Sequence, residues 1–152
     1  MVIAVVIMAV SLPSFLSMGR GAGMRTAVNN VRSTVSLSRQ WAITHRVEIT
    51  FVASSTGLVY TTNNLIVLAT NDHACYYATN SEGGLVQSVT DLPLDVTFGD
   101  AKVSLTFKTD GGLDGNVTDP SDIIIVDKRN ASDADKKRTI SITRLTGGIN
   151  VE

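Results

Sequence analysis

The sequence contains few of the side chains that carry most enzyme chemistry. Its 152 residues include one cysteine and two histidines. A single cysteine excludes an internal disulfide, and we expect Cys75, which stands in an apolar run, to be buried. No motif connects His45 with His73, or either histidine with the cysteine, so neither a catalytic triad nor a zinc site is indicated. We therefore predict a protein that is not an enzyme and that uses no cofactor or metal.

Charge is also scarce. Charged residues make up 18% of the chain, and residues 1–19 contain none. The net charge of −1 gives no global indication of a nucleic-acid partner or an acidic substrate. Because no basic residues precede the first apolar run, a secretory signal peptide fits poorly.

The uncharged N-terminal run is the most hydrophobic feature of the sequence. At about 1.5 Å per residue, residues 1–18 are short for a hydrocarbon core of about 30 Å. The run is either a buried element of a soluble domain or part of a longer membrane helix. We favour the membrane helix, bent at its proline, because such an apolar terminus would aggregate a soluble protein. The residues expected to enter a membrane or a filament core are Val2, Ile3, Val5, Val6, Ile7, Val10, Leu12, Pro13, Phe15 and Leu16.

A second helical segment is predicted over residues 24–45, after a glycine-containing joint that closes a first segment of residues 1–23. Its apolar residues recur at spacings of three and four, which places them on one face. Arg25, Arg32 and Arg39 repeat every seven residues on another face, either as a solvated surface or to pair with acidic groups of a neighbouring subunit. The residues expected to pack this helix against a head are Met24, Val28, Val31, Val35, Trp41 and Ala42.

From residue 46 to residue 152 the pattern changes to alternating apolar and polar residues, rich in β-branched side chains, which predicts strands. Clusters of Gly, Asn, Asp and Ser separate them, and residues 146–148 suit a hairpin turn between the last two strands. The fully apolar residues 123–126 predict a central strand. The fold class is therefore α+β, a long N-terminal helix packed on an antiparallel sheet or sandwich, with 24–152 as the globular domain. The predicted strands are 47–52, 58–62, 65–68, 75–78, 85–89, 94–98, 103–107, 123–126, 139–143 and 148–151.

Two polar segments of the head receive weaker interpretations. Residues 110–119 carry oxygen ligands at a spacing that suggests calcium, but ordinary turn chemistry is favoured because the EF-hand spacing is not met. A basic cluster between residues 128 and 138 is a candidate patch for DNA or a partner. A solvated loop is favoured there, because acidic residues interleave and no aromatic residues accompany it. The members of the cluster are Lys128, Arg129, Lys136, Lys137 and Arg138.

Three stretches of the sequence carry a resemblance to a known family. The apolar run ending in Leu12-Pro13-Ser14-Phe15 looks like the distal half of a pilin membrane helix. Residues 31–46, followed by the alternating residues 47–51, are similar to a helix-to-strand signature. Residues 105–111 look like an F-x-x-x-G turn, and residues 138–149 look like a closing hairpin. With these features the sequence resembles the type IV pilin-like proteins, and among them the GspH/FimT group of minor pseudopilins.

The resemblance implies a structural subunit of a type II secretion pseudopilus or a type IV pilus, located near the filament tip. Such a subunit waits in the bacterial inner membrane on a single helix, with its head in the periplasm or outside, and then joins an extracytoplasmic filament. The implied partners are other pilin or pseudopilin subunits. A prepilin peptidase is a further partner if the true start lies upstream of Met1, as we expect from the missing leader, processing glycine and acidic helix residue.

Two alternative functions stay open. Some FimT-like members bind DNA during uptake, so a DNA-binding minor pilin is the first alternative, although nucleic acid is not the partner that we favour. The second alternative is a secreted β-rich binding domain whose apolar N-terminus is a remnant.

Overall fold

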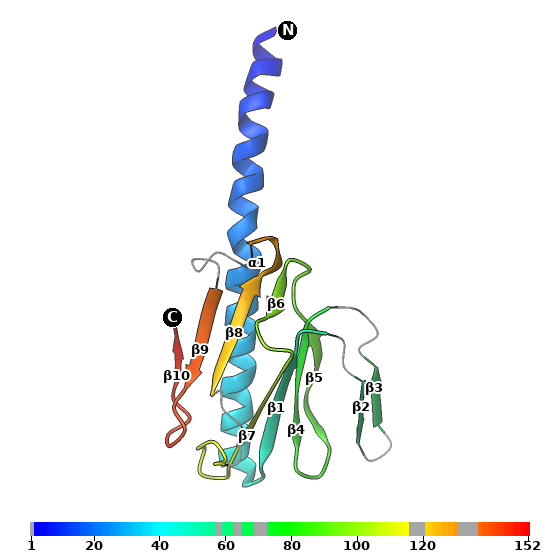
Figure 1. The fold of residues 1–152 in the computed structure, drawn as a ribbon, viewed down its shortest axis with the longest axis vertical. Coiled ribbons are helices and arrows are strands. Elements are labelled where there is room, and N and C mark those ends of the chain that lie inside the picture. The colour runs from blue at the N-terminus through cyan, green and yellow to red at the C-terminus, as the bar shows by residue number, and fades with distance from the viewer. Residues whose placement is uncertain (1, 57–58, 63–64, 69–72, 116–120, 131–136) are drawn as a thin grey trace.

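The first element of the fold is one long helix, α1 (Val2–His45), of 44 residues (Figure 1). The computed structural model describes the backbone of residues 2–56, 59–62, 65–68, 73–115, 121–130 and 137–152. It describes the side chains of residues 22–56, 73–115, 121–129 and 137–152. α1 continues unbroken through residues 19–23, where the glycine-containing joint was predicted. Glycine lowers helix propensity by about 1 kcal/mol per residue, which weakens a helix without requiring a break.

α1 ends at His45 because the next residue leaves the helical conformation. Arg46 has a φ of 55°, in the left-handed region, and it is the position after a helix where such a conformation commonly stops it. The sequence gives no glycine signal for this end. The chain then turns directly into the first strand.

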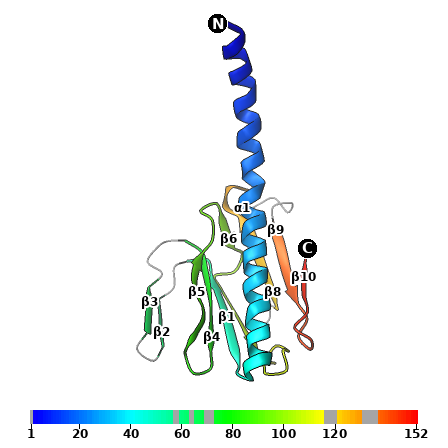
Figure 2. The ribbon, with the colours of Figure 1, turned by 180° about the vertical axis from the view of Figure 1, so that it is seen from behind.

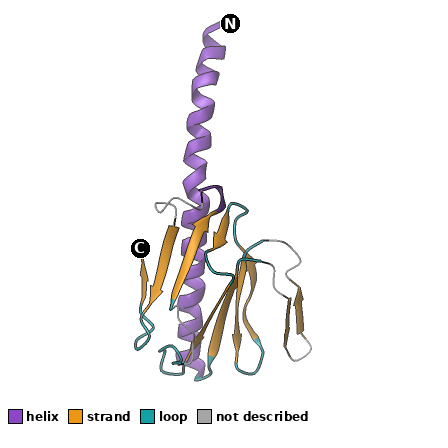
Figure 3. Cartoon of the chain, in the orientation of Figure 1, coloured by secondary structure: helices purple, strands orange, loops and turns teal. Residues whose placement is uncertain are grey.

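Ten strands follow α1 in the part of the chain that the structure describes (Figure 3). Each corresponds to a strand predicted from the sequence and differs from it only at the ends. A short 3₁₀ helix, η1 (Lys128–Asn130), lies between the eighth and ninth strands. The strands are β1 (Ile49–Ser54), β2 (Val59–Thr62), β3 (Leu65–Leu68), β4 (Cys75–Asn80), β5 (Leu85–Asp91), β6 (Val96–Phe98), β7 (Lys102–Phe107), β8 (Asp122–Asp127), β9 (Lys137–Ile142) and β10 (Ile149–Val151).

The described strands form two four-stranded antiparallel sheets and one hairpin. The first sheet has the order β5-β4-β1-β7, the second has the order β10-β9-β8-β6, and β2 pairs with β3. β8 lies inside the second sheet, between β9 and β6, which confirms the central strand predicted from its apolar sequence. The last two strands pair through the predicted turn, where Gly147 has a φ of 62°.

The two sheets lie side by side, and the second half of α1 crosses the same face of both. In Figure 1 the helix runs behind the strands, and in Figure 2 it runs in front of them. Contacts join α1 to strands of both sheets, and those to β1 and β8 are the most extensive. The predicted α+β class, with one helix packed on antiparallel sheets, is confirmed.

The core lies between the helix and this face of the sheets. Ile49, Phe51 and Phe107 contribute from the first sheet, and Ile125 and Ile140 from the second. All five are 0% exposed, and the alternation of buried positions along β7 and β9 follows the period of two expected for strands covered on one face. Cys75 is also buried, as predicted, although it lies outside this cluster.

Candidate functional site

The first half of α1 extends well beyond the strands, so that the N-terminus is far from the head (Figures 1 and 2). The residues predicted to enter a membrane or filament core, Val2 to Leu16, all lie on this part of α1, and their side chains fall outside the described residues. Among the helical residues whose side chains are described, no stretch has both the length and the apolar character needed to cross a membrane.

The second half of α1 packs on the head through small side chains. Val31, Val35 and Ala42 are 0% exposed, Val28 is 7% exposed, and Met24 is partly buried against the core. Two buried polar residues complete this face, and the Ser38 hydroxyl donates a hydrogen bond to the carbonyl oxygen of Thr34, 2.8 Å away. Small residues let the helix approach the sheets closely, which fixes the direction in which its first half leaves the head.

Trp41 is the exception among the residues predicted to pack against the head. It is 38% exposed, and its ring stacks on His45, with ring centroids 3.8 Å apart. Leu37, one turn earlier on the helix, is 36% exposed. The physical reason is angular, because Trp41 lies about 100° around the helix from the buried Ala42. The side chains of Leu37 and Trp41 therefore lie beside the seam, which is the buried apolar face of α1 formed by Val28, Val31, Val35 and Ala42, and they do not fill it.

A polar junction holds the C-terminal end of α1 to two turns of the head. Arg39 Nε donates a hydrogen bond to the carbonyl oxygen of Gly111, 3.3 Å away. A Cβ added to Gly147 would stand 2.8 Å from Arg39 Nε and would also overlap the Gly111 carbonyl oxygen. Both glycines have positive φ, 84° and 62°, so the close approach needs glycine at both positions.

The two turns of this junction are also bonded to each other. Leu113 N donates to the Arg144 carbonyl oxygen over 2.8 Å, and the Arg144 guanidinium donates to the Gly115 carbonyl oxygen over 3.0 Å. The second and third stretches that carry the family resemblance therefore meet at one place. Sequence reasoning identified both turns but not their contact with Arg39, because nothing local indicates that they meet.

At its opposite end the head contacts α1 at the point where the helix emerges. A Cβ added to Gly23 would stand 3.8 Å from the Cβ of Pro93, in the loop between β5 and β6. The same loop bonds to the end of β8 and to η1. Lys128 N donates to the Asp95 carbonyl oxygen over 2.8 Å, and the Arg129 guanidinium forms an ion pair with the Asp95 carboxylate.

The predicted basic cluster reaches this end of the head, but it does not form one flat patch. Arg129 pairs with Asp95, and Lys136 lies outside the described residues. Lys137 and Arg138 are consecutive in β9, so they point to opposite faces of the sheet. Lys137 lines a hollow beside β6 and β8, and Arg138 lines one beside α1.

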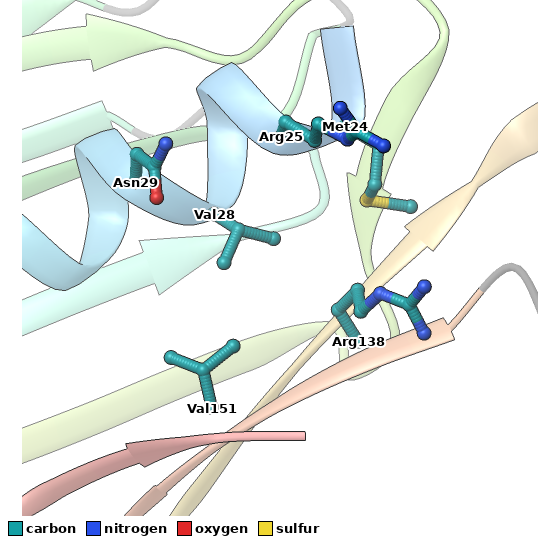
Figure 4. A pocket seen from close by; sticks show the side chains of 6 residues that line it. All are labelled: Met24, Arg25, Val28, Asn29, Arg138 and Val151. Atoms are coloured by element: carbon teal, nitrogen blue, oxygen red, sulfur yellow. The ribbon is translucent and has the colours of Figure 1, made fainter. Parts of the chain in front are cut away.

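The hollow beside α1 has a volume of about 310 Å³ and is mostly apolar (Figure 4). Val28 and Val151 point toward one another across it, from α1 and β10. Two cationic side chains, those of Arg25 and Arg138, stand at its border. Its lining residues are Met24, Arg25, Val28, Asn29, Arg138 and Val151.

The segment predicted to suggest calcium forms an ordinary turn where it is described. Asp110 Oδ1 accepts a hydrogen bond from Gly112 N over 2.8 Å, and the Asp114 carboxylate lies 3.3 Å from Lys108 Nζ. Residues 116–119 lie outside the described part of the chain. Among the described residues, no group of three or more His, Cys, Asp and Glu side chains is arranged to hold a metal ion.

A comparison with protein-family models, with curated proteins and with solved structures finds no match for this chain. The function is therefore inferred from the arrangement of the residues themselves, together with the resemblance of the three stretches.

Proposed function

We propose that this chain is a pilin-like structural subunit that inserts the first half of α1 into a membrane and then into a helical filament. The observation that carries the proposal is one continuous helix with two different environments. One face of its second half is buried against both sheets, and its first half extends beyond them as an apolar rod that is uncharged through residue 19. Of the systems that the resemblance implies, a type II secretion pseudopilus or a type IV pilus suits such a subunit.

The dimensions of α1 support this proposal. At about 1.5 Å per residue, the uncharged residues 2–19 extend over roughly 27 Å, close to the thickness of a hydrocarbon core of about 30 Å. The head begins at Gly23, where α1 meets the loop that contains Pro93. A subunit of this shape would hold its head at the outer surface of the bacterial inner membrane while the rod is surrounded by lipid.

Filament assembly then requires the rod to exchange lipid for other helices. Lipid tails are as apolar as the side chains of the rod, so this transfer has little hydrophobic driving force. Close packing and polar pairing must favour the filament instead. Other pilin-like subunits are therefore the partners that we propose, and we place this subunit near the filament tip. A prepilin peptidase is a further proposed partner, acting before assembly, if the true start lies upstream of Met1.

The DNA-binding alternative receives less support from the geometry. Arg129 is paired with Asp95, and Lys137 and Arg138 lie on opposite faces of β9. DNA binding needs several cations on one accessible surface, because each contact with a phosphate adds to the affinity through its charge. A secreted binding domain is the remaining alternative, and membrane fractionation separates it from a filament subunit.

The test is fractionation of cell membranes after an alkaline carbonate wash. We expect the full chain to stay in the membrane pellet. Replacing Val6 and Val10 together with arginine should release it, because each charge at the bilayer centre costs about 2.5–3.5 kcal/mol. The matched control introduces arginine at Ser36 and Gln40, which have the same spacing and are exposed on the part of α1 that packs on the head. This control variant should stay in the pellet. A full chain that the wash extracts would contradict the proposal.

A further inference from the structure

We propose that the end of the head from which α1 emerges binds the surface of an anionic membrane while the rod is inserted. This inference rests on the proposed function, and it adds a lipid-binding role for the head itself. We name this end of the head the collar. It is not one flat face, because Lys137 and Arg138 lie on opposite faces of β9, but both stand near the end of the head that would meet the membrane plane. The collar comprises Arg25, Leu94, Lys128, Arg129, Lys137 and Arg138.

Four segments that are distant in the sequence form the collar. The loop after β5 contacts α1, where Pro93 approaches Gly23. The Asp95 backbone and carboxylate bind η1, and β9 begins opposite the end of β8, with Lys137 paired in register to Val126. In Figure 1 these segments all lie at the end of the head that faces the protruding half of α1.

The collar carries an excess of positive charge. It has five cationic side chains, and two carboxylates contact one of its residues: Asp95 pairs with the Arg129 guanidinium, and Asp127 accepts a hydrogen bond from the Arg129 backbone N. Two further acidic residues lie nearby: Glu152 is bonded to Thr139 through the backbone, and Asp100 lines the same hollow as Lys137. With both of them included, an excess of one positive charge remains among the described residues. Lys128 and Arg129 are both exposed, although Arg129 is partly neutralised by Asp95.

The collar also exposes apolar surface. Leu94 is 68% exposed, next to the Arg129–Asp95 ion pair. The hollow beside α1 adds apolar walls from Met24, Val28 and Val151, with Arg25 and Arg138 at its border. Cationic side chains around apolar ones are the chemistry that binds the headgroup region of a bilayer.

The position of the collar selects a lipid surface over other anionic partners. The uncharged part of α1 ends at residue 19, and the first charge is Arg20. From Arg20 to the first head contact at Gly23 the helix rises only about 4.5 Å. That distance is shorter than the Debye length of about 8 Å at physiological salt, so the collar would lie within the field of an anionic surface. An exposed Leu94 gains nothing from a phosphate backbone, which disfavours nucleic acid.

The experiment uses the full chain reconstituted in vesicles, with a tryptophan at the collar as reporter. Trp41 is the only tryptophan of the sequence, so the variant Leu94→Trp, Trp41→Phe reports on the collar alone. The reporter is measured in vesicles of neutral phosphatidylcholine and in vesicles that also contain phosphatidylglycerol, each with brominated acyl chains as quenchers. We expect quenching and a blue shift of the emission in the anionic vesicles, lost in about 1 M salt, where the Debye length falls to about 3 Å.

Charge reversal identifies the residues responsible. Lys128→Glu with Lys137→Glu should abolish the quenching, since each cation near such a surface contributes about 1 kcal/mol, a fivefold change in binding. The matched control is Arg32→Glu with Arg46→Glu, which makes the same change in net charge at exposed positions outside the collar and should keep the quenching.

The outcomes separate this inference from the proposed function. Equal quenching in neutral and anionic vesicles, or equal loss in the control pair, would overturn the collar as an electrostatic surface. Release of the reporter by added duplex DNA would assign the collar to nucleic acid instead. A reporter that stays solvent-exposed while the chain resists carbonate extraction would overturn the collar alone. A chain that carbonate extracts from every vesicle would overturn both.

Discussion

Arg39 and Gly111, which are 72 residues apart in the sequence, are joined by a hydrogen bond from the guanidinium Nε to the backbone carbonyl oxygen. This bond ties the C-terminal part of α1 to the turn after β7. The closing hairpin packs on the same guanidinium through Gly147. The direction of α1 relative to both sheets therefore depends on this junction as well as on the apolar seam.

Replacing Arg39 with alanine should lower the free energy of unfolding by about 1 kcal/mol. The bond uses a charged donor but is only part-buried, so its net contribution is modest. The measurement is urea denaturation of the full chain in detergent. Arg32→Ala is the control, because Arg32 is exposed on the same helix, and a loss as large as that of Arg39→Ala would contradict the role of the junction.

Gly147→Ala should destabilise the protein by about 3 kcal/mol. The added Cβ would force a left-handed φ of 62° on alanine and would overlap the Gly111 carbonyl oxygen. Gly115→Ala is the matched control, since a Cβ there has no heavy atom within 4 Å. Thermal unfolding of the two variants should therefore separate them clearly, and similar melting temperatures would show that the two turns do not meet as described.

Val31→Ala should cost about 2 kcal/mol of stability. Val31 is 0% exposed at the centre of the seam, and the substitution removes two buried methyl groups from between α1 and the sheets. Leu37→Ala on the flank of the same helix removes more carbon but should cost less, because Leu37 is 36% exposed. The reverse order in chemical denaturation would mean that the helix packs on a different face.

Tyr76 should make stability fall at alkaline pH. Burial raises the pKa of its phenol above the ordinary value of 10.0, while hydrogen bonds with Thr34 and Thr90 act in the opposite direction. The unfolded chain ionises first, so the contribution is fully present below pH 10 and is lost as pH rises toward the folded-state pKa. The slope reaches at most about 1.4 kcal/mol per pH unit. Unfolding measured from pH 8 upward should show a fall that Tyr76→Phe reduces, and an unchanged slope in that variant would contradict it.

Much of the fold follows from local patterns in the sequence. The period of two and the glycine-containing turns located the strands, and the apolar residues 123–126 identified β8 as central. These signals are local, because side-chain alternation and turn chemistry depend on residues a few positions apart. The spacing of Val28, Val31 and Val35 likewise identified the buried face of α1.

The features that the sequence did not predict depend on contacts between distant segments or on the angular position of a residue around α1. The Arg39 junction joins distant segments, and no local feature marks it. Trp41 was predicted to pack against the head, but its angle around the helix places it beside the buried face instead. The division of Lys137 and Arg138 between two faces could have been predicted, because consecutive residues in a strand point to opposite sides. The exposure of Leu94 was not predicted, because residues 94–98 were expected to form a strand, whereas Leu94 lies in the loop before β6.

The most direct test of the central claim is photo-crosslinking from the rod inside native membranes. A photoreactive amino acid at Val10 should crosslink to lipid before assembly, and to other subunits through their N-terminal helices once filaments form. The same group at Gln40, which is exposed on the head's part of α1, serves as the control and should not crosslink to lipid. If Val10 never crosslinks to another helix under conditions in which filaments are present, the chain is not a filament subunit.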